Sequence, residues 1–384
     1  MRVLYDDLGL RESHGGVSRY FSELFRNFPS DIEPVICQQE SVNKYMLSPP
    51  FNIPPARYSF DKFLPGCNLI GRSYLYRLVS GMLPRLFPAY ERMNQKLFKR
   101  HIGSLDFDIV HLTSPHGSSE GWGTRAWHSV IGKKPIVLTV HDLIPDKLNK
   151  SHRVARQRRF ELGAASHIIA VSNNTKRDLI DLYNVPEAKI SVIYHGYTAK
   201  VDNMCGSVFP DMRYILYVGK RGGYKNSDFF VRSMVPMLKS DKELHLVFTG
   251  GRFSDVELKT FSDLGIANQV HQRFVSDAEM GGLMANALCF VYPSKYEGFG
   301  IPILDAFSVG CPVVLSRCSC FPEVAGDAAL YFDDNDAEGL RSCVKSLSDD
   351  AFRQKMIGLG KIRVQMFSWI DAAKQTADIY RKVM

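Results

Sequence analysis

Two carboxylates, Glu297 and Asp305, lie eight residues apart in the stretch YEGFGIPILDAFSVGCPVV. The apolar run LCFVYPS precedes them and is typical of a buried strand. Pro302 suits the first turn of a helix, and Gly310 suits its end. We therefore expect a loop that carries Glu297, followed by a short helix that carries Asp305 in its first or second turn.

The start of such a helix offers unpaired N–H groups and the positive end of a dipole, which together bind phosphate. Phe299, Gly300 and Ile301 come directly before or at that start, and the glycine lets the backbone approach a ligand closely. Asp305 could then accept hydrogen bonds from ribose hydroxyls, and Glu297 could reach a second part of the ligand. The alternative is that both acids only complement the helix dipole, which is a modest electrostatic effect.

Short runs rich in valine and isoleucine recur along the chain and are separated by patterns of helical spacing. Such runs are typical of parallel strands buried on both faces, and their alternation with helices predicts an α/β fold. In the first half they are RVLYD, PVICQ, DIVHL, PIVLTV, HIIAVS and ISVIY; in the second they are YILYVG, LHLVFTG, VHQRFV, LCFVYPS and PVVLS. We expect two doubly wound, Rossmann-like domains that face a central cleft at the carboxyl ends of their strands.

The seam between the two halves is predicted in residues 196–214, which lack periodicity and contain Gly and Pro. The expected domains are 1–200 and 201–366. The last helix, 367–384, could dock on either half, including by crossing back to the first. A chain of 384 residues is long enough for two such domains.

The composition, with 45% hydrophobic and 23% charged residues, is typical of a globular protein. No apolar stretch approaches the roughly 18 residues that span a bilayer. The opening MRVLYDD is typical of a strand, not of a secretory segment. We expect a cytoplasmic protein, either free or at the inner face of the membrane. The eight cysteines are scattered without metal-ligand spacing, so neither a metal nor a disulfide is expected.

The net charge of +8 is concentrated in residues 57–100, which contain nine Lys or Arg and two acids. One interpretation is a pair of helices with a solvated basic face. The other is a cationic, aromatic-rich surface that contacts an anionic membrane or a phosphate-bearing acceptor. Nucleic acid is not expected as a partner, because the chain has no zinc-finger, homeodomain or similar recognition motif.

The stretch PSKYEGFGIPILDAFSVGCPVVLS resembles the signature of glycosyltransferase family four, which are retaining enzymes of the GT-B fold. The family pattern has two glutamates, and Asp305 stands where the second would be. CSCFPEVAGDAALYFDDND and the terminal FSWIDAAKQTADIY also resemble the family. The resemblance covers essentially the whole chain and rests on several motifs in the same order.

This resemblance implies a role for each matching residue. Glu297 matches the glutamate that holds the donor sugar near its reacting carbon, and Asp305 matches the residue that binds ribose. The stretch YVGKRGGYKN resembles the family loop whose cations bind the diphosphate. Lys225 matches its lysine, and either Lys220 or Arg221 could be the second cation. Two cations suit a leaving nucleotide on which charge builds as the glycosidic bond breaks.

In the first half, Gly15 and Gly16 resemble the glycine pair that lets the backbone approach the donor phosphate and the acceptor. The spacing does not fit a nicotinamide-binding fingerprint. His141, in TVHDLIP, matches a family element that contacts the donor sugar and shapes the acceptor site. His111 and His116, in VHLTSPHGS, lie at the end of another strand and are candidates for the acceptor side.

The resemblance implies that 1–200 is the acceptor-side domain and that 201–366 binds the nucleotide sugar. Taken with the features above, it implies a retaining hexosyltransferase. It would move a mannose-type or similar sugar from a GDP- or UDP-sugar to a glycan, lipid-linked acceptor in surface polysaccharide synthesis. No Asp-x-Asp metal motif of the GT-A type is evident, so no metal or cofactor is required in this interpretation. The alternatives are a GT-B epimerase or phosphorylase, and a non-catalytic protein that binds nucleotide sugars.

Overall fold

The computed structural model consists of two compact units. The first comprises Met1–Tyr194 and Trp369–Met384, and the second comprises His195–Ser368. The units therefore change at residues 194/195 and 368/369, against the expected 200/201 and 366/367. The described residues are 1–6, 8–10, 15–36, 43–47, 51, 53, 92, 96, 99–115, 131–149, 152–198, 209 and 212–384. Most of the basic segment 57–100 lies outside the described residues, and so does His116.

The first unit is built on a six-stranded parallel sheet with the order β2-β1-β3-β4-β5-β6. Its strands are β1 (Arg2–Tyr5), β2 (Glu33–Ile36), β3 (Ile109–Leu112), β4 (Ile136–Val140), β5 (His167–Ala170) and β6 (Ile190–Val192). Every side chain of β3, β4 and β5 is buried, as expected for parallel strands covered on both faces.

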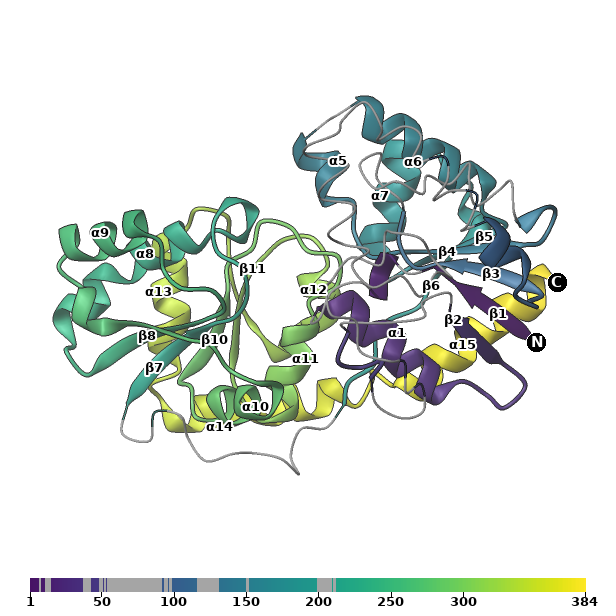
Figure 1. Cartoon of the computed structure of the whole chain (residues 1–384). Coiled ribbons are helices and arrows are strands. Elements are labelled where there is room, and N and C mark those ends of the chain that lie inside the picture. The colour runs from purple at the N-terminus through teal and green to yellow at the C-terminus, as the bar shows by residue number, and fades with distance from the viewer. Residues whose placement is uncertain are drawn as a thin grey trace. The chain divides into compact units, whose positions relative to one another are not determined.

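Helices cover both faces of this sheet (Figure 1). They are α1 (Gly16–Asn27), α5 (Ile144–Asn149), α6 (His152–Ala164), α7 (Asn173–Tyr183) and α15 (Trp369–Val383). The last helix, α15, packs beside α1, and its Trp369, Ala373 and Tyr380 join the apolar core formed by Tyr20 and Phe21. Helix α15 is thus a structural part of the first unit.

The second unit has a six-stranded parallel sheet with the order β12-β11-β10-β7-β8-β9. Its strands are β7 (Arg213–Tyr217), β8 (Leu244–Thr249), β9 (Val270–Arg273), β10 (Cys289–Tyr292), β11 (Val313–Ser316) and β12 (Leu330–Phe332). In chain order this is the doubly wound 3-2-1-4-5-6 arrangement, read from β9 to β12. The sequence predicted each of these strands except β12.

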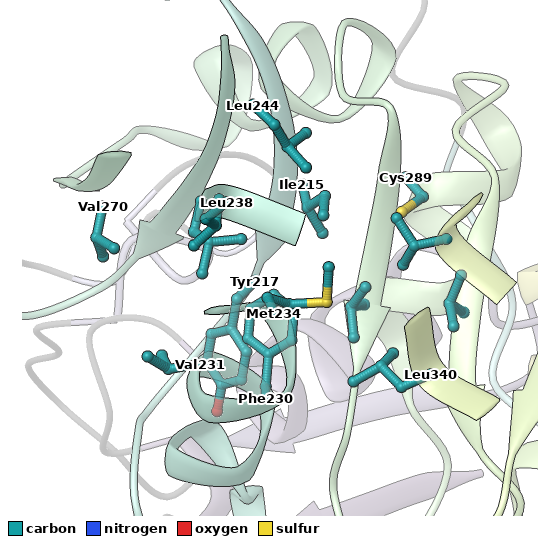
Figure 2. Close-up of a cluster of buried hydrophobic side chains, with 14 of the residues drawn as sticks. Ile215, Tyr217, Phe230, Val231, Met234, Leu238, Leu244, Val270, Cys289 and Leu340 are labelled. Carbon is teal, nitrogen blue, oxygen red and sulfur yellow. The ribbon is translucent and has the colours of Figure 1, made fainter. Parts of the chain in front are cut away.

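Two groups of helices sandwich the second sheet (Figure 1). They are α8 (Ser227–Ser240), α9 (Asp255–Asp263), α10 (Asp277–Ala285), α11 (Ile301–Ser308), α12 (Phe321–Ala325), α13 (Ala337–Ser346) and α14 (Asp350–Val364). Figure 2 shows part of the apolar core, where Phe230, Met234 and Leu238 of α8 pack against Ile215 and Tyr217 of β7. This buried cluster fixes the sheet that carries the loops described next.

The strand order of the second sheet reverses between β7 and β10, which are direct neighbours. Ligands of open α/β sheets bind at the carboxyl ends of strands at such a point, because the two following loops diverge there. The loop after β7 contains Lys220, Arg221 and Lys225, and the loop after β10 contains Glu297. The fold thus brings the sequence-predicted cations and carboxylate to one place in the second unit.

Candidate active site

Lys225 and Glu297 form an ion pair at the switch point of the second sheet. Lys225 ends the 3-10 turn Gly223–Lys225, and its Nζ lies 2.6 Å from Oε1 of Glu297. The two side chains are only 17% and 10% exposed. The loop that carries Glu297 is also fixed by its backbone, since the N–H of Lys295 donates to the carbonyl of Tyr224 at 2.8 Å. The two loops therefore support each other.

Aromatic side chains surround this ion pair. Nζ of Lys225 lies 5.1 Å from the ring centre of Tyr224 and 5.5 Å from that of Tyr292. Burial, and then the nearby carboxylate of Glu297, raise the pKa of Tyr292 well above its ordinary value. The Tyr292 hydroxyl therefore stays protonated at neutral pH. The ammonium group lies in a partly desolvated, aromatic setting that strengthens its attraction for anions.

The two candidates for the second cation differ in their surroundings. Arg221 donates to Glu257 at 2.6 Å and to the carbonyls of Gly251 and Arg252 at 2.8 and 2.7 Å. Its guanidinium also lies 4.7 Å from the ring centre of Phe253. Lys220 has an exposed side chain, while its backbone carbonyl accepts the Tyr217 hydroxyl at 2.7 Å. These contacts favour Lys220 as the cation for a ligand and a structural role for Arg221.

Helix α11 begins where the sequence predicted. Gly300 is its N-cap, with φ of +92° and no side-chain cap. A Cβ at that position would lie 3.0 Å from Cδ1 of Ile303 and 3.2 Å from Cε1 of Phe321, so both conformation and space require glycine. Ile301 is the first helical residue and is partly exposed, whereas Asp305 is 6% exposed in the second turn. The start of α11 thus presents backbone N–H groups close behind Glu297 in the chain.

Phe299 was predicted at the donor site, and the structure buries its side chain at 4% exposure. Its ring stacks on His195, with centres 4.4 Å apart, and meets Phe367 edge-on at 5.9 Å. Phe299 therefore anchors the loop by packing, which leaves its backbone as the part that could meet a ligand. A pattern along the chain does not show that His195 meets Phe299, so the sequence analysis did not find this contact.

In the first unit, Gly15 is the N-cap of α1 and Gly16 its first residue. His141 follows β4 directly, with its ring 5.1 Å from Tyr20 and 5.7 Å from Phe21, both edge-on. Burial lowers the pKa of His141 to about 4, although a hydrogen bond with the backbone of Thr113 opposes this. The imidazole is therefore neutral at pH 7.

Asp142 accepts the N–H of Ile144, the first residue of α5, at 3.0 Å. This bond favours a role for Asp142 in capping α5. Similarly, Ser172 caps α7 by accepting the N–H of Thr175.

His111 is fully buried in β3, and both ring nitrogens have partners. Nδ1 lies 2.5 Å from the hydroxyl of Tyr380 and Nε2 lies 2.7 Å from that of Thr139. Burial lowers its pKa to about 3. The Tyr380 hydroxyl also meets that of Tyr5. This network favours a structural role for His111, which ties α15 to the first sheet, over a contact with an acceptor. The other acceptor-side candidate, His116, lies outside the described residues.

A cavity of about 590 Å³ lies between α8 and α9, beside the loop after β7. Lys220, Arg221 and Gly222 line one side, and Phe248 and Phe261 contribute apolar surface. Its lining includes none of Lys225, Glu297 and Asp305, so the cavity does not enclose the ion pair.

Among the described residues, no group of three or more His, Cys, Asp or Glu is arranged to hold a metal ion. The cysteines at 289, 311, 318, 320 and 343 are all reduced. Within the same part of the chain, none of the helices combines the length and apolar character needed to cross a bilayer.

Comparison with known proteins assigns both units. Residues 14–200 match the sequence profile "Glycosyltransferase Family 4", and residues 212–350 match "Glycosyl transferases group 1". The chain is 29% identical to O-antigen chain mannosyltransferase B of Escherichia coli over 69% of this chain and 78% of that protein. It is 28% identical to MMP alpha-(1->4)-mannosyltransferase of Mycolicibacterium hassiacum over 73% of this chain and 71% of that protein.

The fold is also found among solved structures. HepE of Anabaena, solved in complex with UDP-glucose, superposes with a TM-score of 0.70 at 16% identity and covers 100% of both chains. The two parallel sheets are consistent with the two profile matches. The chain belongs to glycosyltransferase family 4, the group 1 glycosyltransferases, and has the GT-B fold.

Proposed function

We propose that this enzyme transfers mannose or a similar hexose, with retention, from a nucleotide-diphosphate sugar to a glycan acceptor in bacterial surface polysaccharide synthesis. The observation that carries the proposal is the buried Lys225–Glu297 pair at the switch point, directly before helix α11. The choice of mannose rests on the names of the two relatives, both of which are mannosyltransferases.

In this proposal the donor diphosphate binds Lys225, Lys220 and the N–H groups at the start of α11. The phosphate charge then competes with Glu297 for the Lys225 ammonium group, which is 2.6 Å away in this structure. Once displaced from that contact, the Glu297 carboxylate is available to the sugar. Lys225 thereby couples donor binding to the release of the Glu297 carboxylate for contact with the sugar.

For the chemical step, the bond between the anomeric carbon and the phosphate oxygen breaks, and positive charge develops on the sugar ring. Glu297 stabilises that charge without forming a covalent bond. The acceptor hydroxyl attacks from the face that the phosphate leaves, and a phosphate oxygen takes its proton. A glycosidase with two carboxylates would have no need of the lysine or the phosphate site.

The remaining site residues have supporting roles in the proposal. Asp305 binds the ribose; because Asp is one methylene shorter than Glu, we expect its contact to be longer or water-bridged. Gly15 and Gly16 let the backbone approach the donor phosphate and the acceptor, and neutral His141 contacts the sugar. The cations take the charge of the leaving group, so we expect transfer to continue when a chelator removes divalent metal.

A product assay tests the assignment. The protein is incubated with GDP-mannose, UDP-glucose and other nucleotide sugars, with and without lipid-linked glycan, and the products are separated. A glycosylated acceptor supports the proposal. An epimerised donor or a free sugar phosphate would support the epimerase or phosphorylase reading, and binding without turnover across the panel would support a non-catalytic binder.

The acceptor is proposed to be lipid-linked because residues 57–100 are strongly basic and rich in aromatic and apolar residues. This places the enzyme at the cytoplasmic face of a membrane. Sedimentation with vesicles that contain anionic lipid tests it, together with neutralisation of Arg72, Arg77 and Arg85. Absent vesicle binding, combined with unchanged transfer by the variant, would contradict the membrane part of the proposal.

A further inference from the structure

The loop that carries Glu297 is held by a second loop, residues 317–320, that the proposed function does not use. This second loop follows β11, the neighbour of β10 in the sheet. Oγ of Ser319 accepts the backbone N–H of Glu297 at 3.0 Å. Sγ of Cys320 donates to the backbone carbonyl of Glu297 at 3.2 Å. Both polar backbone groups of Glu297 are thus bonded by side chains of consecutive residues.

The same loop also secures the chain three residues earlier. Sγ of Cys318 donates to the carbonyl of Ser294 at 3.0 Å, and the Ser316 hydroxyl bonds to that same carbonyl. A loop without helix or strand hydrogen bonds must satisfy its buried polar groups in some other way. Here the segment 316–320 does so on both sides of the turn that leads to Glu297.

The backbone conformation of Ser319 indicates that a hydroxyl group is needed at this position. Ser319 has φ of +45°, in the left-handed region that non-glycine residues adopt only at a cost. Glycine would adopt this conformation without strain, but it has no hydroxyl to accept the N–H of Glu297. A strained residue that persists because of one contact is typical of functional loops.

We infer that Ser319 is a positioning residue for Glu297, with Cys320 as its second point of attachment. The inference rests on the proposed function, since it gives a catalytic purpose to the placement of Glu297. Lys225 holds the carboxylate only until a donor phosphate competes for it. The bonds from Ser319 and Cys320 act on the backbone of Glu297. They therefore still hold the Cα of Glu297 in place after Lys225 has bound the donor phosphate.

The test compares Ser319→Ala with Ser319→Gly. Both variants remove the hydroxyl, but glycine also removes the strain at φ +45°, so its thermal stability should equal or exceed that of the alanine variant. A positioning role predicts that kcat falls about ten- to a hundredfold in both variants, with the KM for donor nearly unchanged. Ser319→Asn should recover part of kcat, because asparagine tolerates this conformation and offers an acceptor oxygen.

Asn335→Gly is the matched control. Asn335 has φ of +60° in an exposed position of the same unit, so this substitution relieves the same kind of strain away from Glu297. We expect its kcat to equal that of the unmodified enzyme. If Ser319→Gly retains normal kcat, or if kcat in the Ser319 variants follows their thermal stability, the positioning role is refuted.

Amide hydrogen exchange gives a readout that does not depend on transfer. The N–H of Glu297 is the group that Ser319 holds, so exchange in a peptide spanning 293–300 should accelerate at least tenfold in Ser319→Gly. Unchanged exchange would refute the contact itself. If the unmodified protein binds nucleotide sugars but transfers nothing, the proposed function fails instead, and the exchange result still decides whether Ser319 fixes this loop.

Discussion

The Lys225–Glu297 pair allows a quantitative prediction about the second unit. At an effective dielectric constant near 20, two unit charges 2.6 Å apart attract by about 6 kcal/mol before desolvation is subtracted. Removing one partner of a buried pair costs about 3–5 kcal/mol, because the other charge is left buried. Since these side chains remain 10–17% exposed, we expect Lys225→Met and Glu297→Gln each to cost about 2–4 kcal/mol.

The double variant should cost clearly less than the sum of the two, because no unpaired charge remains. We expect a coupling free energy of about 2 kcal/mol in this double-mutant cycle. Lys259 and Asp263 provide the matched control. They form an exposed pair in the same unit, 3.2 Å apart with side chains 77% and 64% exposed. Lys259→Met should therefore cost about 0.5 kcal/mol or less.

The assay must report on the second unit alone, because a chain with two units need not unfold in one step. All three tryptophans lie outside 195–368, so tryptophan fluorescence cannot serve. Hydrogen exchange of the slowest amides in β7, β8 and β10 measures the unfolding free energy of this unit directly. A coupling free energy below about 0.5 kcal/mol, or a Lys225 effect no larger than that of Lys259, would refute the reasoning.

Three further predictions follow from other contacts. Gly300→Ala should destabilise the second unit by about 2 kcal/mol or more and raise the KM for donor, because its Cβ would meet Ile303 and Phe321. Gly265→Ala is the control: its φ is +68°, and its Cβ would meet only Cε of Lys239, at an ordinary contact distance of 4.0 Å. It should show only the conformational cost of about 1 kcal/mol and an unchanged KM. If Gly300→Ala and Gly265→Ala destabilise the second unit equally, the predicted clash at Gly300 is contradicted. His141 should lower the free energy of unfolding of the first unit by about 2 kcal/mol between pH 7 and pH 5. The pKa of His141 is about 4 in the folded state and about 6.5 in the unfolded chain, so the unfolded chain takes up the proton first as the pH falls. Urea titrations at both pH values check this, and His141→Gln should remove that part of the pH dependence; an unchanged dependence would contradict it. Tyr380→Phe should cost the first unit about 1–3 kcal/mol, because it leaves the buried ring of His111 with one partner fewer, and an effect below about 0.5 kcal/mol on exchange in β3 would contradict the network.

The sequence predicted the two sheets well because buried parallel strands leave long apolar runs. It missed β12, Leu330–Phe332, because the apolar run LYF lies between GDAA and DD and is too short to distinguish a strand from a loop. It predicted the start of α11 from Gly300 and Pro302, whose conformational preferences are local. Features governed by local backbone chemistry were therefore accessible without a structure.

The parts of the site that escaped prediction all depend on contacts between distant residues. Ser319 meets the backbone of Glu297 across 22 positions, and His195 stacks on Phe299 across a much longer interval. The choice between Lys220 and Arg221 was open from sequence, since only the fold shows that Arg221 bonds to Glu257. Likewise, the position of His111 at a strand end suggested a contact with the acceptor. Its buried bonds to Tyr380 and Thr139 favour a structural role.

The most direct test of the central claim is the activity of Glu297→Gln, measured with the donor and acceptor that the product assay identifies. The unmodified enzyme should retain the anomeric configuration of the donor, as read by NMR. In the variant, kcat should fall by about 10²–10³-fold or more, while calorimetry finds nucleotide binding within a few fold of normal. Near-normal turnover by Glu297→Gln, or a product of inverted configuration from the unmodified enzyme, would contradict the account.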